Sequence, residues 1–73
     1  MKQPRAAVIV TWRDVGIHFG CVGIVRRASD RRKLYETGEP YGYGQRWAAL
    51  CDAKDWAIAH DYLMIEERMD GER

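Results

Sequence analysis

The stretch IHFGCVGIVRRASDRRKLYET, residues 17–37, decides the fold of this chain. Its first part, Ile17–Arg27, carries apolar side chains at both odd and even positions and predicts a strand with apolar groups on both faces. Its last part, Arg31–Thr37, alternates and predicts a second strand, paired with the first as a hairpin. Gly20 and Gly23 offer no side chain to pack, which indicates a bulge or a close approach of another backbone.

Two further elements flank this hairpin. On its N-terminal side, Ala6–Trp12 (AAVIVTW) is β-branched and apolar, and predicts another strand. On its C-terminal side, the glycine-rich loop Gly38–Gly44 must interrupt the sheet. Gln45 to about His60 then holds Ala, Leu, Lys and Asp without Gly or Pro, and predicts a helix with Gly44 as a weak N-cap.

The last part of the chain fits two interpretations. Tyr62–Arg68 continues the helix, or the segment YLMIE from Tyr62 adds a fourth strand at the sheet edge, which we favour. We expect residues 1–5 and 69–73 to be frayed. The predicted fold is therefore a single α+β domain over residues 1–73, in which a small antiparallel three-stranded sheet carries one helix on a face, in the order β-β-β-α(-β).

The predicted helix has two apolar stripes. At 100° per residue, one face gathers Ala49, Ala53, Trp56, Ala57 and His60, and the opposite face gathers Trp47, Cys51 and Ile58. The alanine face is expected to pack on the sheet. The other stripe predicts an interface with a second subunit or a partner, unless Trp47 merely covers the core edge and Ile58 is a tolerated exposed residue.

Size and composition narrow the class of protein. A chain of 73 residues is near the lower limit for folding without disulfides or metal, so a homodimer is expected. A hydrophobic fraction of 47% excludes a disordered tail, and a charged fraction of 32% excludes a membrane protein. The start of the chain has too short an apolar run for a secretory signal, which predicts a cytoplasmic location.

Charge is divided unevenly along the chain. Residues 1–34 hold eight cations and two anions, whereas residues 35–73 hold four cations and nine anions. The cations cluster in RRASDRRK at the hairpin, and the predicted nucleic-acid or acidic-partner contacts are Arg13, Arg26, Arg27, Arg31, Arg32 and Lys33. Arginines fork onto phosphate oxygens, and a two-stranded ribbon fits a DNA groove. This hypothesis requires the hairpin cations to be free, and the alternative is a charged hairpin end that is simply solvated.

The loop EPYGYGQ precedes the predicted helix and resembles a glycine-rich anion loop. It lacks the Lys-Ser/Thr of a P-loop, so the signal is weak. Tyr41 and Tyr43 are candidates for stacking on bases, with packing over the sheet edge as the alternative.

Residue types that carry metal or catalytic chemistry are few. The soft ligands are His18, Cys21, Cys51 and His60, and on a strand His18 and Cys21 point to opposite faces, so no metal site or cofactor is predicted. The two cysteines are expected to be reduced thiols, with a single bridge as the alternative. The sequence contains no catalytic motif such as HExxH, and we predict that the protein is not an enzyme.

Together these features favour a small binding module that contacts nucleic acid or a nucleoprotein complex through its basic β-hairpin. Small three-stranded-sheet DNA-binding domains of the integrase amino-terminal and plant AP2 types are similar in topology alone. The alternative is a homodimeric protein-interaction or inhibitor domain, of the phage accessory or counter-defence type, that binds a host protein through the stripe of Trp47, Cys51 and Ile58.

Overall fold

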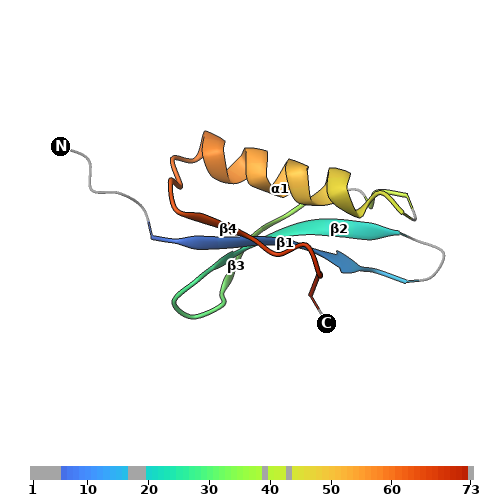
Figure 1. Ribbon diagram of the computed structural model, residues 1–73, viewed down its shortest axis with the longest axis horizontal. Coiled ribbons are helices and arrows are strands. Elements are labelled where there is room, and N and C mark those ends of the chain that lie inside the picture. The colour runs from blue at the N-terminus through green and yellow to red at the C-terminus, as the bar shows by residue number, and fades with distance from the viewer. Residues whose placement is uncertain (1–5, 17–19, 39, 43, 73) are drawn as a thin grey trace.

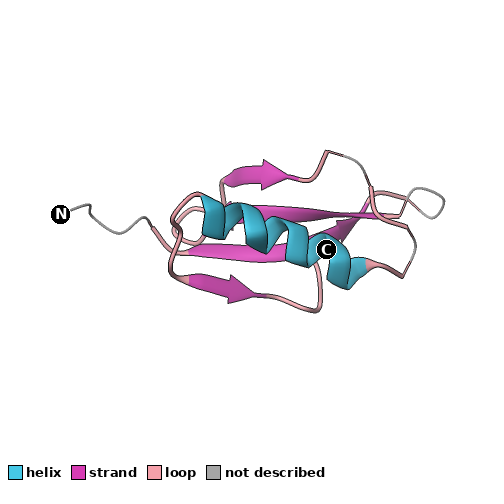
Figure 2. Ribbon diagram, turned by 90° about the horizontal axis from the view of Figure 1, so that it is seen from above, coloured by secondary structure: helices cyan, strands magenta, loops and turns pink. Residues whose placement is uncertain are grey.

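The computed structural model describes residues 6–16, 20–38, 40–42 and 44–72. Its elements follow in the order β1 (Val8–Asp14), β2 (Cys21–Arg27), β3 (Lys33–Glu36), α1 (Arg46–Ala59) and β4 (Ile65–Glu67). The strands form one sheet in the order β3-β2-β1-β4, and α1 lies across one of its faces (Figures 1 and 2). The predicted α+β fold, with a three-stranded antiparallel core and a fourth edge strand, is confirmed.

Strand pairing places the two edges of the sheet far apart in sequence. β1 pairs with β2 in antiparallel register, from Val8 opposite Arg27 to Asp14 opposite Cys21. β3 continues the antiparallel arrangement on the other side of β2, with a register shift between Val25 and Arg26. The chain then crosses the sheet through α1, so that β4 adds to the free edge of β1 in parallel. This parallel crossover makes the sheet mixed.

Two glycines of β2 and the segment before it allow close backbone contacts, as the sequence predicts. A Cβ at Gly23 would lie 2.0 Å from the carbonyl oxygen of Ala49, so the helix backbone touches the sheet there. Gly20 has a φ of +89°, and a Cβ on it would lie 1.7 Å from the carbonyl oxygen of Tyr41. Only glycine fits at either position without a shift of the neighbouring backbone.

The core lies between α1 and the sheet face beneath it. Ala49, Ala53 and Ala57 are fully buried, which confirms the alanine face of the helix. Their small side chains let the helix approach Val8, Val10 and Val25, which are also fully buried. Aromatic rings extend this core toward β3, where Trp56 stacks on Tyr35 with ring centroids 4.8 Å apart.

Helix ends and strand limits differ slightly from the sequence-based expectation. Gln45, rather than Gly44, occupies the N-cap position, and His60 is the C-cap. The fourth strand covers Ile65–Glu67 instead of starting at Tyr62. The predicted start of the second strand at residues 17–19 lies outside the described residues, as do residues 1–5 and Arg73. Among the described residues, no helix is long and apolar enough to cross a bilayer.

The segment after β4 is held against the sheet, although the sequence predicts fraying there. The indole Nε1 of Trp12 donates to the carbonyl of Met69 at 2.9 Å. The backbone N–H of Glu72 donates to the carbonyl of Trp12 at 2.8 Å. Residues 68–72 therefore run beside β1 beyond the end of β4.

Candidate functional site

The sheet face opposite α1 gathers long charged side chains. Strand alternation and register direct the following residues to this face, which we call the open face: Ile9, Thr11, Arg13, Val22, Ile24, Arg26, Lys33, Glu36, Glu66 and Arg68. No described helix or strand covers it, as the side view in Figure 1 shows. The structure thus places Arg13, Arg26 and Lys33 on one face, although these predicted contact residues come from separate segments of the sequence.

An apolar floor lies beneath these charges. Ile24 is fully buried, and Ile9 and Val22 are about 5% exposed or less, although no described helix packs on them. The guanidinium of Arg13 on β1 donates to the carboxylate of Glu36 on β3 at 2.8 Å. Because β2 lies between these strands, this ion pair spans β2 on the side of Val22 and Ile24. Arginine stems can cover apolar surface in this way while their charged heads stay hydrated.

Arg26 makes the most extensive ion pair of the open face. Its Nε and Nη2 donate to the two carboxylate oxygens of Glu72 at 2.7 and 2.6 Å, and its Nη1 donates to the carbonyl of Arg31 at 2.9 Å. The side chains of Arg26 and Glu72 are 25% and 24% exposed. The hydrogen bonds with Arg26 lower the pKa of the Glu72 carboxyl and raise the pKa of the guanidinium. Both groups are therefore charged and joined at neutral pH.

The turn between β2 and β3 is organised by Asp30. Its carboxylate accepts hydrogen bonds from the Nε of Arg27 at 2.9 Å and from the backbone N–H of Arg32 at 3.1 Å. These bonds lower the pKa of Asp30 far below its ordinary value. Arg31 adopts a positive φ of 64° in the same turn. The acidic residue inside the basic cluster thus fixes the shape of the turn.

Three of the five hairpin cations, Arg26, Arg27 and Lys33, are paired within the chain, so the expectation that all of them are free is wrong. Arg27 pairs with Asp30, and Lys33 pairs with Glu36, which also binds Arg13. Within the described part of the chain, only the side chains of Arg31 and Arg32 among the predicted contacts have no ion pair. The six predicted cations face three carboxylates, those of Asp30, Glu36 and Glu72. These nine residues together carry a net charge of about +3.

The structure does not bring the predicted tyrosine to the arginines. Tyr41 bridges Cys21 at the start of β2, whereas Arg26 and Arg27 end that strand. The hydroxyl of Tyr41 donates to the carboxylate of Asp52 on α1 at 2.8 Å, which raises the pKa of the phenol. Tyr43 lies outside the described residues.

The outer stripe of the helix faces solvent. Trp47 and Ile58 are each 55% exposed, and Cys51 is half-buried. The ammonium of Lys54, on the same side of α1, lies 2.6 Å from the carboxylate of Glu67, so the outer stripe lies on the side of the helix nearer to β4.

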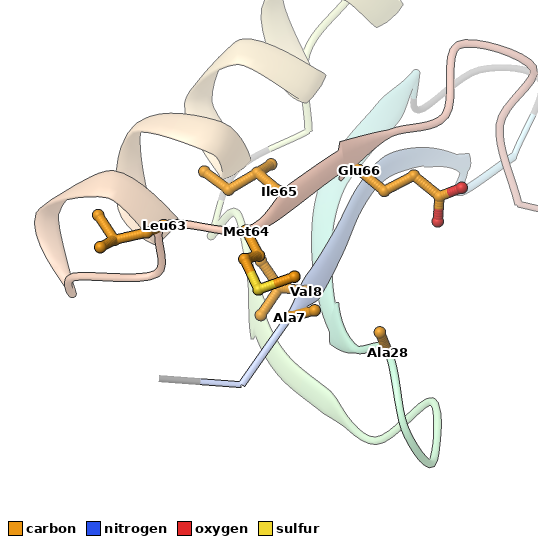
Figure 3. Close-up of a pocket in the computed structure, with 7 residues that line it drawn as sticks. All are labelled: Ala7, Val8, Ala28, Leu63, Met64, Ile65 and Glu66. Atoms are coloured by element: carbon orange, nitrogen blue, oxygen red, sulfur yellow. The ribbon is translucent and has the colours of Figure 1, made fainter. Parts of the chain in front are cut away.

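Beside it, the loop into β4 exposes Leu63 and Met64 by 79% and 63%. Met64 lies against Ala7 and Val8 at a hollow of about 480 Å³ on the same edge of the sheet (Figure 3). A second exposed apolar surface therefore exists at the β4 edge.

The soft ligands named from the sequence do not form a metal cluster in the described part of the chain. Cys21 and Cys51 are free thiols, and burial raises the pKa of the Cys21 thiol. No group of three or more His, Cys, Asp or Glu side chains gathers there in a way that could hold a metal ion. His60 hydrogen-bonds the carbonyl of Trp56, and His18 lies outside the described residues.

Sequence reasoning missed Glu36 and Arg68 on the open face, and Glu72 beside it. Each lies more than twenty positions from an important contact, since Glu36 is 23 residues from Arg13 and Glu72 is 46 residues from Arg26. No local pattern marks them, because every carboxylate in an acidic half of the chain looks alike before the fold is known.

No protein-family model, curated protein or solved structure matches this chain.

Proposed function

We propose that the protein is a non-enzymatic module that binds the phosphate backbone of nucleic acid across its open face and the adjoining β2–β3 turn. The observation that carries this proposal is the excess of cations at one sheet face. Arg13, Arg26, Lys33 and Arg68 lie there with the carboxylates of Glu36 and Glu66, and the adjoining turn adds Arg31 and Arg32. A flat face of this kind suits contacts with phosphates along a strand better than insertion of a ribbon into a groove.

The internal ion pairs weaken such binding without preventing it. Exposed pairs such as Arg27 with Asp30 typically stabilise a protein by about 0–1 kcal/mol. Contact between a guanidinium and a phosphate also releases condensed counterions, a gain that a carboxylate of the same molecule cannot provide. We therefore expect modest affinity, no strong sequence preference, and a steep loss of binding as salt rises.

The test measures fluorescence anisotropy of labelled single-stranded and duplex oligonucleotides over a salt series. The double variant Arg31→Gln with Arg32→Gln removes the two hairpin cations that have no ion pair. The negative slope of log K against log[salt] should then become less steep by about 2. Arg46→Gln is the matched control, because Arg46 lies over the Trp12 ring at the helix end and pairs with Asp14. No binding at low salt, or an equal loss in the control, would refute the proposal.

A second candidate function rests on the apolar surface at the β4 edge. The outer stripe of α1 adds Trp47 and Ile58, the β4 edge adds Leu63 and Met64, and all four side chains are more than half exposed. This observation favours a homodimeric protein-interaction domain.

Its test is solution mass by light scattering over a wide concentration range. Trp47→Ser with Ile58→Ser should convert a dimer to a monomer, whereas Met69→Ser, which changes an exposed side chain outside α1, should not. A monomeric wild-type protein at high concentration would contradict this candidate.

A further inference from the structure

Three arginines surround a small pocket between the open face and residues 68–72. Arg26, Arg31 and Arg68 line it, over a floor formed by Ile9 and Thr11. Its volume is about 50 Å³, far below the roughly 300 Å³ at which ordinary ligand pockets begin. The pocket admits water but no nucleotide while residues 68–72 lie in this position.

The carboxylate of Glu72 fills the anionic position of this pocket. Both of its oxygens accept hydrogen bonds from Arg26, in the two-pronged geometry with which arginine also binds phosphate. Glu72 is the one carboxylate that lines this pocket, beside three arginines. A second carboxylate, that of Glu66, lies 3.4 Å from the guanidinium of Arg68. The site therefore keeps a surplus of positive charge even when Glu72 occupies it.

Few contacts hold Glu72 in place. Its backbone N–H donates to the carbonyl of Trp12, and the segment is tied back at its start, where the carbonyl of Arg68 accepts the hydroxyl of Thr11 at 3.1 Å. Residues 69–72 belong to no strand. Movement of Glu72 away from Arg26 breaks the two hydrogen bonds of this ion pair and the backbone hydrogen bond to Trp12, while the bond from the Trp12 indole to the carbonyl of Met69 still anchors the segment and the strands stay paired.

We propose that this pocket is a phosphate site and that Glu72 is its internal competitor, which must leave before a phosphate of a nucleic acid can take its place on Arg26. This inference rests on the function proposed above and adds its regulation. The apparent dissociation constant for nucleic acid is then the intrinsic one divided by the fraction of molecules in which Glu72 has left Arg26. Weak binding by the intact chain and tighter binding after loss of one carboxylate follow from the same geometry.

The first experiment compares two variants that make the same change of charge in the same segment. Glu72→Gln removes the competitor, and we expect it to bind a labelled single-stranded DNA oligonucleotide about 5- to 30-fold tighter than the wild type. Asp70→Asn removes one negative charge from an exposed side chain two residues away, and its gain should stay below about 2-fold because solvent and salt screen that charge. Adding Arg26→Gln to Glu72→Gln should abolish the larger gain.

A second measurement uses the wild-type chain and needs no variant to fold. In an NMR titration with the same oligonucleotide, the Nε–H signal of Arg26 and the side-chain carboxyl signal of Glu72 should both shift as binding saturates. If both signals stay unchanged at saturation, or if Glu72→Gln gains no more than Asp70→Asn, this inference is overturned while the proposed function stands. If the wild type and every variant fail to bind at low salt, the proposed function fails and this inference with it.

Discussion

Gly23 is the position where the fold leaves the least room, and Gly23→Ala tests how closely α1 lies on the sheet. The added Cβ would sit 2.0 Å from the carbonyl oxygen of Ala49 and 3.0 Å from the Cβ of Ala53. An ordinary contact with that oxygen needs about 3.4 Å, so strand and helix must separate by about 1.4 Å. The obstacle is helix backbone next to fully buried side chains, which cannot rotate away.

The expected loss of stability can be worked from these contacts. Overpacking a core costs about 1–3 kcal/mol, and a rigid backbone obstacle places this site at the upper end. Replacing glycine by alanine in a strand returns about 0.5–1 kcal/mol through the entropy of the unfolded chain. The net destabilisation is about 2 kcal/mol, which lowers Tm by about 8–16 °C in a domain of this size. Circular dichroism during thermal and urea unfolding measures both quantities.

Gly38→Ala is the matched control. A Cβ at Gly38 meets no atom within 4 Å, and the residue does not need a positive φ. The control should therefore keep or slightly raise the free energy of unfolding, by up to about 1 kcal/mol. Equal midpoints for Gly23→Ala and Gly38→Ala would refute the close approach of helix and sheet.

Three further predictions concern acid stability, thiol reactivity and backbone conformation. Because Arg26 lowers the pKa of Glu72, their pair contributes its full stability above the ordinary glutamate pKa of 4.5 and loses it as pH falls through the lowered value. Unfolding of Glu72→Gln should thus depend less on pH than that of the wild type below about pH 4.5, and parallel curves would contradict the pair. Alkylation followed by mass spectrometry should label half-buried Cys51 before Cys21, whose burial raises its pKa; equal rates would contradict this order. Gly20→Ala should lower Tm, since it meets both a positive φ and a backbone oxygen, and an unchanged Tm would contradict that placement.

Local patterns were sufficient to predict most of the fold. The β-branched run before Trp12 forms β1, and the alanines of the helix define the face that packs on the sheet. Gly20 and Gly23 predict a bulge or a close backbone approach, and in the structure both lie close to another backbone, at Tyr41 and Ala49. These features depend on neighbours in sequence or on helical spacing, which a single chain displays directly.

The candidate site could be predicted only in part, because its charges are paired over long distances. The division of the chain into a basic and an acidic half suggests a molecule with two opposite ends. In the fold, Glu36 on β3 pairs with Arg13 on β1, and Glu72 after β4 pairs with Arg26 on β2. Opposite charges far apart in sequence thus neutralise each other. The pair of Arg13 with Glu36 depends on the antiparallel order of β1, β2 and β3, and the pair of Arg26 with Glu72 depends on the parallel crossover into β4.

If the proposed function holds, the arginines of the open face cover apolar surface and also bind phosphate, and the first role limits how they perform the second. The ion pair of Arg13 with Glu36 spans β2 on the side of the buried Val22 and Ile24, so we expect that turning Arg13 outward toward a ligand would expose apolar surface. A ligand must instead reach the guanidinium groups where they lie and replace the carboxylates of Glu36 and Glu72. An extended polyanion can do so by laying successive phosphates along the sheet, because each exchange leaves the arginine stems in place. The burial of Ile24 therefore favours binding that follows the backbone of a nucleic acid over binding that depends on its bases.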